Sequence, residues 1–340
     1  MEEACCQKNV IKLQFHRKLF LGVDDMEKRR HVIKKKPASG SRIRLAGGIA
    51  GAAVLVLAAA VFLQGRWAAS GGQAETGGRE NVLETAARAP GISAGAAILM
   101  DAGDGTVLYE YNADQKMYPA STTKIMTALV VLELCEELGI GLDGEIIVPA
   151  EAEGVEGSSL YLKTGERLTL EELLYGLMLQ SGNDAAVALG TAMGGGAETG
   201  LVQFVEWMNE KASELGCSGT HFVNPNGLYN EEHYTTARDL ARIAQTALQH
   251  DEFRRIVSAE GWNSPGGSGR SFTNKNKTVF QYEGGDGVKI GYTKASGRTL
   301  VASATRNGRQ LIAVVLNDGN WFQDAYALLD YGFGRIGEER

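Results

Sequence analysis

Residues 118–129 have the sequence YPASTTKIMTAL, which contains a Ser-x-x-Lys motif formed by Ser121 and Lys124. A spacing of three residues places both side chains on one face of a helix. Pro119 suits a first helical turn, so we expect Ser121 near the helix N-terminus, where free N–H groups stabilise an oxyanion. Burial and a nearby second cation would lower the pKa of Lys124 toward the neutral range that a general base needs. The alternative is an exposed serine beside a solvated lysine, and this short motif alone does not decide.

A second motif, Ser181-Gly182-Asn183, lies in LMLQSGNDAA between two predicted helices. We expect this loop to point into the same cleft. Ser181 would pass a proton between Lys124 and a leaving group, and Asn183 would hold a substrate amide. The alternative is an ordinary turn, because serine, glycine and asparagine are all common turn residues.

A third element, Lys289-Ile290-Gly291-Tyr292-Thr293, follows a glycine-rich stretch and begins a predicted strand. At a sheet edge Lys289 would place a cation opposite Ser121, and the Tyr292 N–H would be a second oxyanion donor. The alternative is an exposed strand lysine. A serine, two lysines and an asparagine in this order suit a serine acyl-transfer enzyme that uses lysine as its base.

The body of the chain, residues 89–336, has predicted strands at both ends and helices in the middle. Early strands cover 92–100 and 106–111, and late strands, about three in all, include 299–304 and 310–316. Helices are expected to begin at or near Ser121, Thr169, Asp184, Gly200, Thr236 and Phe322, the first ending at Gly139 and the last near Leu329. This order predicts an α+β fold within the broader α/β class. It has a mostly antiparallel sheet covered by helices and a helical subdomain beside the site.

The N-terminal part has a different composition. Residues 1–44 hold 12 Lys and Arg against 5 Asp and Glu, and the 19 residues Leu45–Leu63 carry no charge. That length is close to the ~20 residues that a membrane-spanning helix needs. The basic upstream flank places the N-terminus in the cytoplasm and the body outside. Residues 64–88 are small and polar, which is typical of a flexible spacer.

Two alternatives exist for the segment 45–63. The first alternative is a buried core helix, against which the lack of a polar face argues. The second is a cleaved signal with its cleavage site at Ala68-Ala69-Ser70. A basic region of more than ~40 residues is long for a cleaved signal, so we favour a retained single-pass anchor in the cell membrane.

Composition argues against several kinds of partner. Beyond residue 44 the chain has 22 Lys and Arg against 36 Asp and Glu, and an acidic body disfavours nucleic-acid binding. The five histidines show no metal-ligand spacing, and we expect no metal or other cofactor. The four cysteines form no disulfide framework, and nothing in the sequence selects a bridge between Cys135 and Cys217.

Together the three motifs resemble those of the serine D-alanyl-D-alanine carboxypeptidases, the low-molecular-mass penicillin-binding proteins of peptidase type S11. The resemblance covers roughly residues 89–334 and extends to segments outside the site. These are GERLTLEELLYGLMLQSGNDAAVAL (165–189), FVEWMNEKASELG (204–216), THFVNPNGL (220–228), TTARDLARIA (235–244), GGDGVKIGYTKASGRTLVASATRNGRQLIAVVLN (284–317) and DAYALLDYGF (324–333).

The resemblance implies a β-lactamase/transpeptidase-like fold and a peptidoglycan stem peptide ending in D-Ala-D-Ala as substrate. Ser121 would form an acyl-enzyme with the penultimate D-Ala and release the terminal one, and β-lactams would acylate the same serine. Lys124 would be the base. The resemblance also implies that the following residues complete the site: Ser181, Asn183, Lys289, Gly291, Tyr292 and Thr293.

The chain departs from the family at the third motif, which in relatives is Lys-Thr-Gly. Ile290 replaces the threonine, and the loss of one hydrogen bond to a charged group costs roughly 1.5–3 kcal/mol. Thr293 is a partial substitute. The only literal Lys-Thr-Gly, Lys163-Thr164-Gly165, lies before Ser181, and we interpret it as a structural turn. Many relatives also continue into a β-rich domain and a C-terminal anchor helix, so here the N-terminal segment is expected to be the tether.

Two other functions fit the same motifs. A β-lactamase shares the fold, but it needs a carboxylate for fast deacylation, and no Glu-x-x-Leu-Asn occurs between Ser121 and Lys289. A penicillin-binding or wall-binding sensor, inactive because of Ile290, is the non-enzymatic alternative. Release of free D-Ala from a pentapeptide would exclude the sensor.

Overall fold

The computed structural model describes residues 89–196, 199–265 and 268–338. The basic head, the proposed anchor at 45–63 and the spacer at 64–88 lie outside the described residues, so the domain limits there stay predictions. Within the described ranges, no helix is both long and apolar enough to cross a membrane. The same residues contain no cluster of three or more His, Cys, Asp or Glu side chains placed to hold a metal ion.

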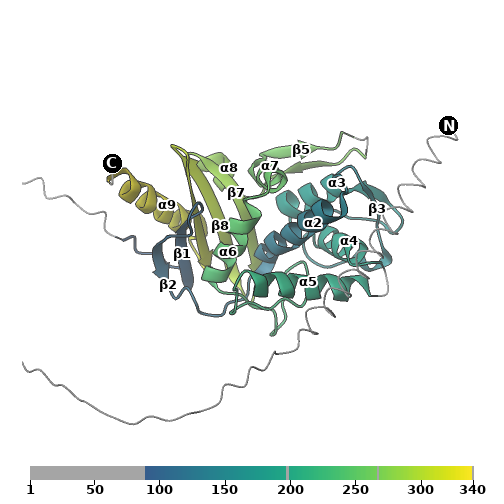
Figure 1. Cartoon of the computed structure of the whole chain (residues 1–340), viewed down its shortest axis with the longest axis horizontal. Coiled ribbons are helices and arrows are strands. Elements are labelled where there is room, and N and C mark those ends of the chain that lie inside the picture. The colour runs from purple at the N-terminus through teal and green to yellow at the C-terminus, as the bar shows by residue number, and fades with distance from the viewer. Residues whose placement is uncertain (1–88, 197–198, 266–267, 339–340) are drawn as a thin grey trace, which may run out of the picture. The chain divides into compact units, whose positions relative to one another are not determined.

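One antiparallel sheet organises the body, with strand order β2-β1-β9-β8-β7 (Figure 1). Its strands are β1 (Ala96–Asp101), β2 (Val107–Tyr111), β7 (Gly285–Thr293), β8 (Gly297–Arg306) and β9 (Arg309–Leu316). Every neighbouring pair is antiparallel. The prediction of two early and three late strands in one sheet is therefore confirmed, and β7, which carries Lys289, is an edge strand.

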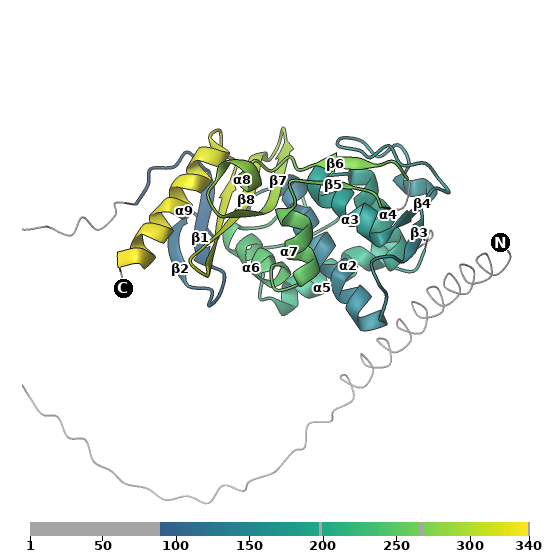
Figure 2. The same cartoon turned by 90° about the horizontal axis from the view of Figure 1, so that it is seen from above.

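Both faces of the sheet are covered. In β1, all of whose residues are buried, Ile98 and Met100 pack with the helical half, whereas Ala97 and Leu99 pack on the side of α9 (Trp321–Glu338). This alternation follows from the two-residue period of a strand. Figure 2 shows α9 on one side of the sheet and most of the other helices on the opposite side. Lys289 and Gly291 can therefore face the helical half while Ile290 faces α9.

The helical half surrounds one central helix. Its members are α2 (Lys124–Leu138), α3 (Leu170–Tyr175), α4 (Asn183–Met193), α5 (Gly200–Glu214), α6 (Ala237–Ala247) and α7 (Asp251–Ser258). The short α8 (Thr278–Gln281) packs against β7 and is followed by Tyr282, whose ring contacts Tyr326 of α9. Eleven of the 15 residues of α2 are buried, because α4, α5, α6 and α7 all pack against it. It ends at Gly139, which has a left-handed φ of 63° as the expected stop signal requires. The helix that carries Lys124 is thus packed against four other helices of this half.

Several local predictions are confirmed. Thr169 and Glu172 form both hydrogen bonds of a capping box at the start of α3. The Thr236 side chain accepts from the Asp239 N–H at the start of α6. These caps are found from sequence because their donors and acceptors lie within three residues of each other.

Other local predictions are wrong or incomplete. Asp184 does not cap α4, since Gly182 holds that position and the Asp184 carboxylate accepts the N–H groups of Leu160 and Leu162 instead. The last helix runs well past Leu329, to Glu338. Helix α7, helix α8 and two small hairpins were not expected. The hairpins are β3 (Glu145–Ile147) with β4 (Arg167–Thr169), and β5 (Gly261–Asn263) with β6 (Ser271–Thr273). Strands of three residues are too short to show an alternating pattern.

Candidate active site

A 3-10 turn, Ala120–Thr123, brings the Ser121 hydroxyl and the Lys124 amine together. Side chains three residues apart eclipse one another in this type of helix. The Lys124 Nζ lies 2.9 Å from the Ser121 Oγ, within hydrogen-bonding distance. The predicted proximity of the two groups is therefore confirmed, although Ser121 lies in the 3-10 turn and α2 starts only at Lys124.

Among the residues that the structure describes, Lys124 has no carboxylate hydrogen-bond partner. Its Nζ donates to the Asn183 Oδ1 at 2.7 Å and to the Asn226 carbonyl at 2.6 Å, and the side chain is fully buried. Burial, followed by the charge of Lys289, holds the pKa of Lys124 well below its usual range. A neutral amine beside a serine hydroxyl is able to accept the hydroxyl proton, which is what a general base must do.

The Ser181-Gly182-Asn183 loop lies on the other side of Lys124. A π-helical segment, Gly176–Gln180, ends at Ser181 in a left-handed conformation with φ 65°, and Asn183 begins α4. The Asn183 Nδ2 donates to the Glu156 carbonyl at 2.6 Å, which turns the amide oxygen toward Lys124. Asn183 therefore orients Lys124, a contact that the sequence did not indicate, and its substrate-binding role stays a prediction.

The Ser181 hydroxyl is buried at 5% exposure beside this network. Within the described residues it makes no hydrogen bond to either Lys124 or Lys289, whose contacts go to other groups. Its predicted part in proton transfer stays a prediction.

The edge strand β7 closes the site. Lys289 is 1% exposed, and burial, followed by the charge of Lys275, lowers its pKa to about 7. Two residues on, a Cβ added to Gly291 would lie 2.8 Å from the Ser121 nitrogen. The strand backbone therefore packs directly against the turn that carries the serine, and only glycine allows this approach.

Residues 83–320 match the model of a family described as D-alanyl-D-alanine carboxypeptidase, peptidase S11. The match covers more than half of the chain and contains every predicted site residue. The chain belongs to this family. Its members use the same arrangement of a serine and a lysine three residues apart, which the turn at Ser121 and Lys124 reproduces.

Relatives and solved structures agree with the family model. The chain is 36% identical over 265 residues to a D-alanyl-D-alanine carboxypeptidase of Streptomyces sp. (strain K15), covering 73% of this chain and 90% of that protein. It is also 36% identical to the D-alanyl-D-alanine carboxypeptidase DacF of Bacillus subtilis (strain 168), over 64% of this chain and 56% of the relative. A crystal structure of the Streptomyces K15 DD-transpeptidase superposes with a TM-score of 0.67 at 34% identity, covering 72% of this chain and 98% of that one. The β-lactamase/transpeptidase-like fold is thereby established, and the aligned part spans about half of the Bacillus relative.

The family segment 220–228 supplies a site contact that sequence reasoning missed. The Asn226 carbonyl accepts from Lys124, and the preceding Pro225 carbonyl accepts from Thr127 one turn further along α2. Gly227 has φ 83°, and a Cβ there would lie 1.9 Å from the Ala120 oxygen. The only available signal was the turn-like Asn-Pro-Asn-Gly, because a backbone carbonyl has no residue signature.

Lys275 is a third cation at the site and was also missed. Its Nζ donates to the Gln180 carbonyl at 2.9 Å, directly before Ser181. Burial lowers its own pKa, and its charge contributes to the lowered pKa of both Lys289 and Lys124. Lys289 and Lys275 thus lie close enough to Lys124 for their charges to act on it, and such charges favour an anionic ligand.

The position at which this chain departs from the family, Ile290, packs with the cluster on the α9 side of the sheet. Its neighbour Tyr292 is 64% exposed at the strand edge. Thr293 is already used within the turn to β8, because its N–H and its hydroxyl both contact the Ser296 Oγ at 2.9 Å. The partial substitution by Thr293 that we expected for the lost hydroxyl would have to break these bonds.

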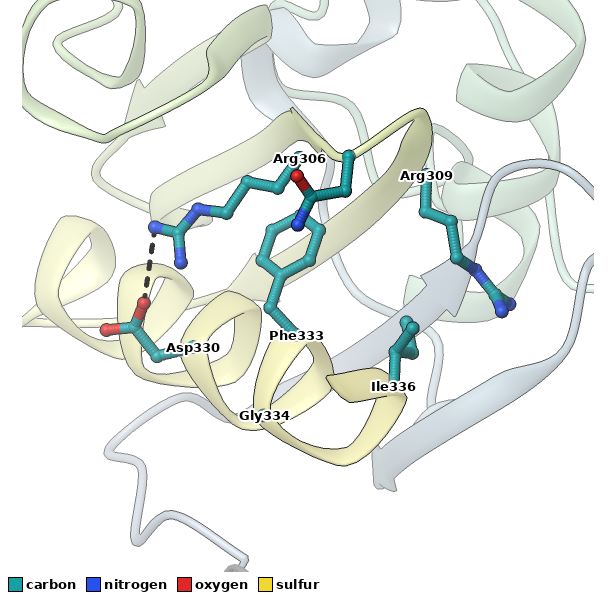
Figure 3. Close-up of a pocket in the computed structure, with 7 residues that line it drawn as sticks. Arg306, Arg309, Asp330, Phe333, Gly334 and Ile336 are labelled. Carbon is teal, nitrogen blue, oxygen red and sulfur yellow. Dashed lines mark hydrogen bonds and ion pairs between the residues drawn. The ribbon is translucent and has the colours of Figure 1, made fainter. Parts of the chain in front are cut away.

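The other Lys-Thr-Gly of the chain lies apart from the site. Lys163 pairs with Glu153 at 3.2 Å, and Thr164 also bonds to Glu153. Its structural interpretation agrees with these contacts. A separate pocket, shown in Figure 3, contains none of the predicted site residues. It is lined by Arg306, Asn307, Arg309, Asp330, Phe333, Gly334 and Ile336.

Proposed function

We propose that this chain is a serine D-alanyl-D-alanine carboxypeptidase that removes the terminal D-alanine from peptidoglycan stem peptides. The observation that carries the proposal is the fully buried Lys124 amine, which lies 2.9 Å from the Ser121 hydroxyl and bonds to no carboxylate in the described part of the chain. Burial shifts an amine in this setting toward its neutral form, which can activate the serine without a histidine. Family membership and the 90% coverage of the Streptomyces relative support the same activity.

In the first half of the proposed reaction, the Ser121 Oγ attacks the carbonyl carbon of the penultimate D-alanine while the Lys124 Nζ accepts the hydroxyl proton. The N–H groups of Ser121 and Tyr292 stabilise the negative charge on the carbonyl oxygen. The proton then passes through Ser181 to the nitrogen of the terminal D-alanine as the C–N bond breaks. In the second half, a water molecule gives a proton to Lys124 and attacks the ester carbonyl, and Lys124 returns that proton to the Ser121 Oγ as the ester bond breaks.

Recognition of the substrate carboxylate falls to the lysines. Lys289 and Lys275 place two ammonium groups near the crevice, and each influences the titration of the amines beside it. A C-terminal carboxylate entering this space would raise the pKa of both amines and keep them charged. The two lysines therefore supply the attraction that the missing hydroxyl at Ile290 does not.

The activity is tested by two measurements on the same preparation. Mass spectrometry after penicillin treatment should show one adduct on the peptide that contains Ser121, and none in the Ser121→Ala variant. Incubation with a pentapeptide ending in D-Ala-D-Ala should release free D-alanine. Rapid turnover of penicillin would instead favour a β-lactamase, and labelling without D-alanine release would favour the sensor.

We also propose that residues 45–63 anchor the protein, with the catalytic body on the outer side of the membrane. The 19 uncharged residues and the basic flank before them support this orientation. Protease added to intact spheroplasts should degrade the body and leave a fragment of the N-terminal head. Protection of the body would contradict the proposed orientation.

A further inference from the structure

The peptide bond between Ala120 and Ser121 joins a turn acceptor to the proposed oxyanion donor. In a trans peptide, the Ala120 carbonyl and the Ser121 N–H lie in one plane and point in opposite directions. Ala120 has φ 49°, a left-handed conformation that residues with a Cβ rarely adopt unless their surroundings enforce it. Whatever holds the Ala120 carbonyl therefore also aims the Ser121 N–H.

Thr123 holds this carbonyl. Its hydroxyl donates to the Ala120 oxygen at 2.8 Å, and both residues are buried. Gly227 packs against the same oxygen, since a Cβ there would lie only 1.9 Å away. The plane of the 120–121 peptide is thus fixed by one hydrogen bond and one close backbone contact.

His233 holds the Thr123 hydroxyl in turn, and the direction of each bond follows from the contacts. The Val223 N–H donates to the His233 Nδ1 at 3.1 Å, so this nitrogen is an acceptor. The proton of a neutral imidazole then lies on Nε2, which is 2.8 Å from the Thr123 Oγ1 and donates to it. The hydroxyl hydrogen of Thr123 therefore remains available for its hydrogen bond to the Ala120 carbonyl.

The imidazole is itself tightly placed. His233 is 2% exposed, and burial, followed by the charges of His221 and Lys124, lowers its pKa to about 3. The ring is therefore neutral wherever the enzyme works. The next residues are tied to other segments, with Tyr234 bridged to His221 and Thr235 bridged to Met117. A neutral ring in a rigid setting suits a structural donor and does not suit a proton carrier.

We propose that His233 is a positioning residue that acts through Thr123 to aim the Ser121 N–H at the developing oxyanion. The proposal rests on the function proposed above, with Ser121 as the nucleophile. The loop at 223–233 already supplies the Asn226 carbonyl that accepts from Lys124. The proposal links the same loop to the placement of the oxyanion donor. The same segment would then support both the base and the oxyanion donor.

The test measures acylation of the His233→Leu variant by a fluorescent penicillin. Stopped-flow fluorescence records the reaction over a range of penicillin concentrations. This measurement separates the non-covalent Kd from the acylation rate constant. Loss of an oxyanion donor slows catalysis by about 100- to 1,000-fold, so partial misalignment should slow acylation and deacylation by roughly 10- to 100-fold. The Kd should change by less than ~2-fold, because the oxyanion forms only in the transition state.

A double-mutant cycle tests the route through Thr123. Thr123→Val should slow acylation about as much as His233→Leu, and the double variant should be no slower than either, because each breaks the same chain. Thr123→Ser and His233→Gln keep a hydroxyl and an N–H donor, and should restore most of the rate.

Thr122→Val is the matched control. The Thr122 hydroxyl bonds to the Pro119 carbonyl in the same turn, but that carbonyl also accepts from Thr299 and does not belong to the 120–121 peptide. Its acylation rate should stay within ~3-fold of the wild type.

Three results would overturn the proposal. The acylation rate constant could be unchanged in His233→Leu, or it could fall equally in Thr122→Val. The reductions of the two single variants could also multiply in the double variant. A role in folding alone would lower the final fraction of labelled protein and leave the rate constant of that fraction unchanged, which also counts against it. Absence of labelling in the wild type would instead refute the proposed function itself.

Discussion

Lys289-Ile290-Gly291 and Lys163-Thr164-Gly165 are two segments of similar sequence in opposite environments. Lys289 is 1% exposed on the edge strand β7, and Gly291 is in close contact with the Ser121 turn. The Lys163 side chain is 73% exposed and pairs with Glu153 on the surface, while Gly165 has open space around it.

The comparison shows that burial, and not residue type, gives the motif its chemistry. The segment that matches the family pattern exactly is a surface turn, whereas the segment that departs from it closes the site. A buried amine loses solvation and shifts toward its neutral form, but an exposed amine does not. The following predictions test this difference, beginning with the largest effect.

Removal of the buried amine should have the largest effect. We expect Lys289→Ala to slow acylation by penicillin by at least ~100-fold, because it removes a preorganised cation from a desolvated site. Lys163→Ala should stay within ~2-fold, since an exposed ion pair contributes little. Acylation kinetics measure both, and similar losses in the two variants would contradict the assignment of the third motif.

Substitution of the glycine in each segment, Gly291 and Gly165, should have the next largest difference in effect on acylation. Gly291→Ala places a Cβ 2.8 Å from the Ser121 nitrogen and 2.5 Å from the Thr299 Oγ1, so the strand must shift. We expect acylation to fall by roughly 10- to 100-fold through the displaced serine. Gly165→Ala has room but keeps φ 82°, and should cost about 1 kcal/mol of unfolding free energy without affecting acylation. Normal acylation by Gly291→Ala would show that the close approach is not required.

Exchange of the middle residues should have a smaller effect. Ile290→Thr restores the hydroxyl of the family pattern, and one hydrogen bond to a charged group is worth about 1.5 kcal/mol, or roughly tenfold. We expect the gain in the non-covalent Kd of a carboxylate-bearing penicillin, and not in the acylation rate constant. Thr164→Ile, the reciprocal change, should alter neither quantity. A gain confined to the rate constant would mean that residue 290 affects the reacting groups and not carboxylate binding.

The pH dependence of stability should show the smallest difference. Burial lowers the pKa of Lys289 from 10.5 to about 7, so between these values the unfolded chain binds a proton that the folded protein lacks. Stability from this group therefore rises with pH above about 7. The increase in Tm from pH 7 to pH 9.5 should be about 6 °C smaller in Lys289→Met than in the wild type. Lys163→Met should follow the wild type, and parallel curves for all three proteins would contradict the burial of Lys289.

Much of the site was predictable because its spacing is local. Ser121 and Lys124 meet across one helical turn, and the capping box at Thr169 closes over three residues. The apolar runs at both ends of the body also predict one sheet that is covered by helices. In contrast, Asp184 has the position of a helix cap in the sequence but binds N–H groups more than 20 residues away. Local propensity could not reveal that competing partner.

The sequence by itself predicted the nucleophile, its base, the order of the three motifs and the antiparallel sheet, because these predictions depend on the spacing of a few residues and on apolar runs joined by short turns. Only the tertiary structure decided which Lys-x-Gly packs against the serine turn, that the Asn226 carbonyl accepts from Lys124 and Lys275 bonds beside Ser181, and that His233 contacts Thr123. The physical reason is that desolvation and backbone hydrogen bonds depend on which distant segments pack together. Neither is encoded by the identity of the residue that is buried.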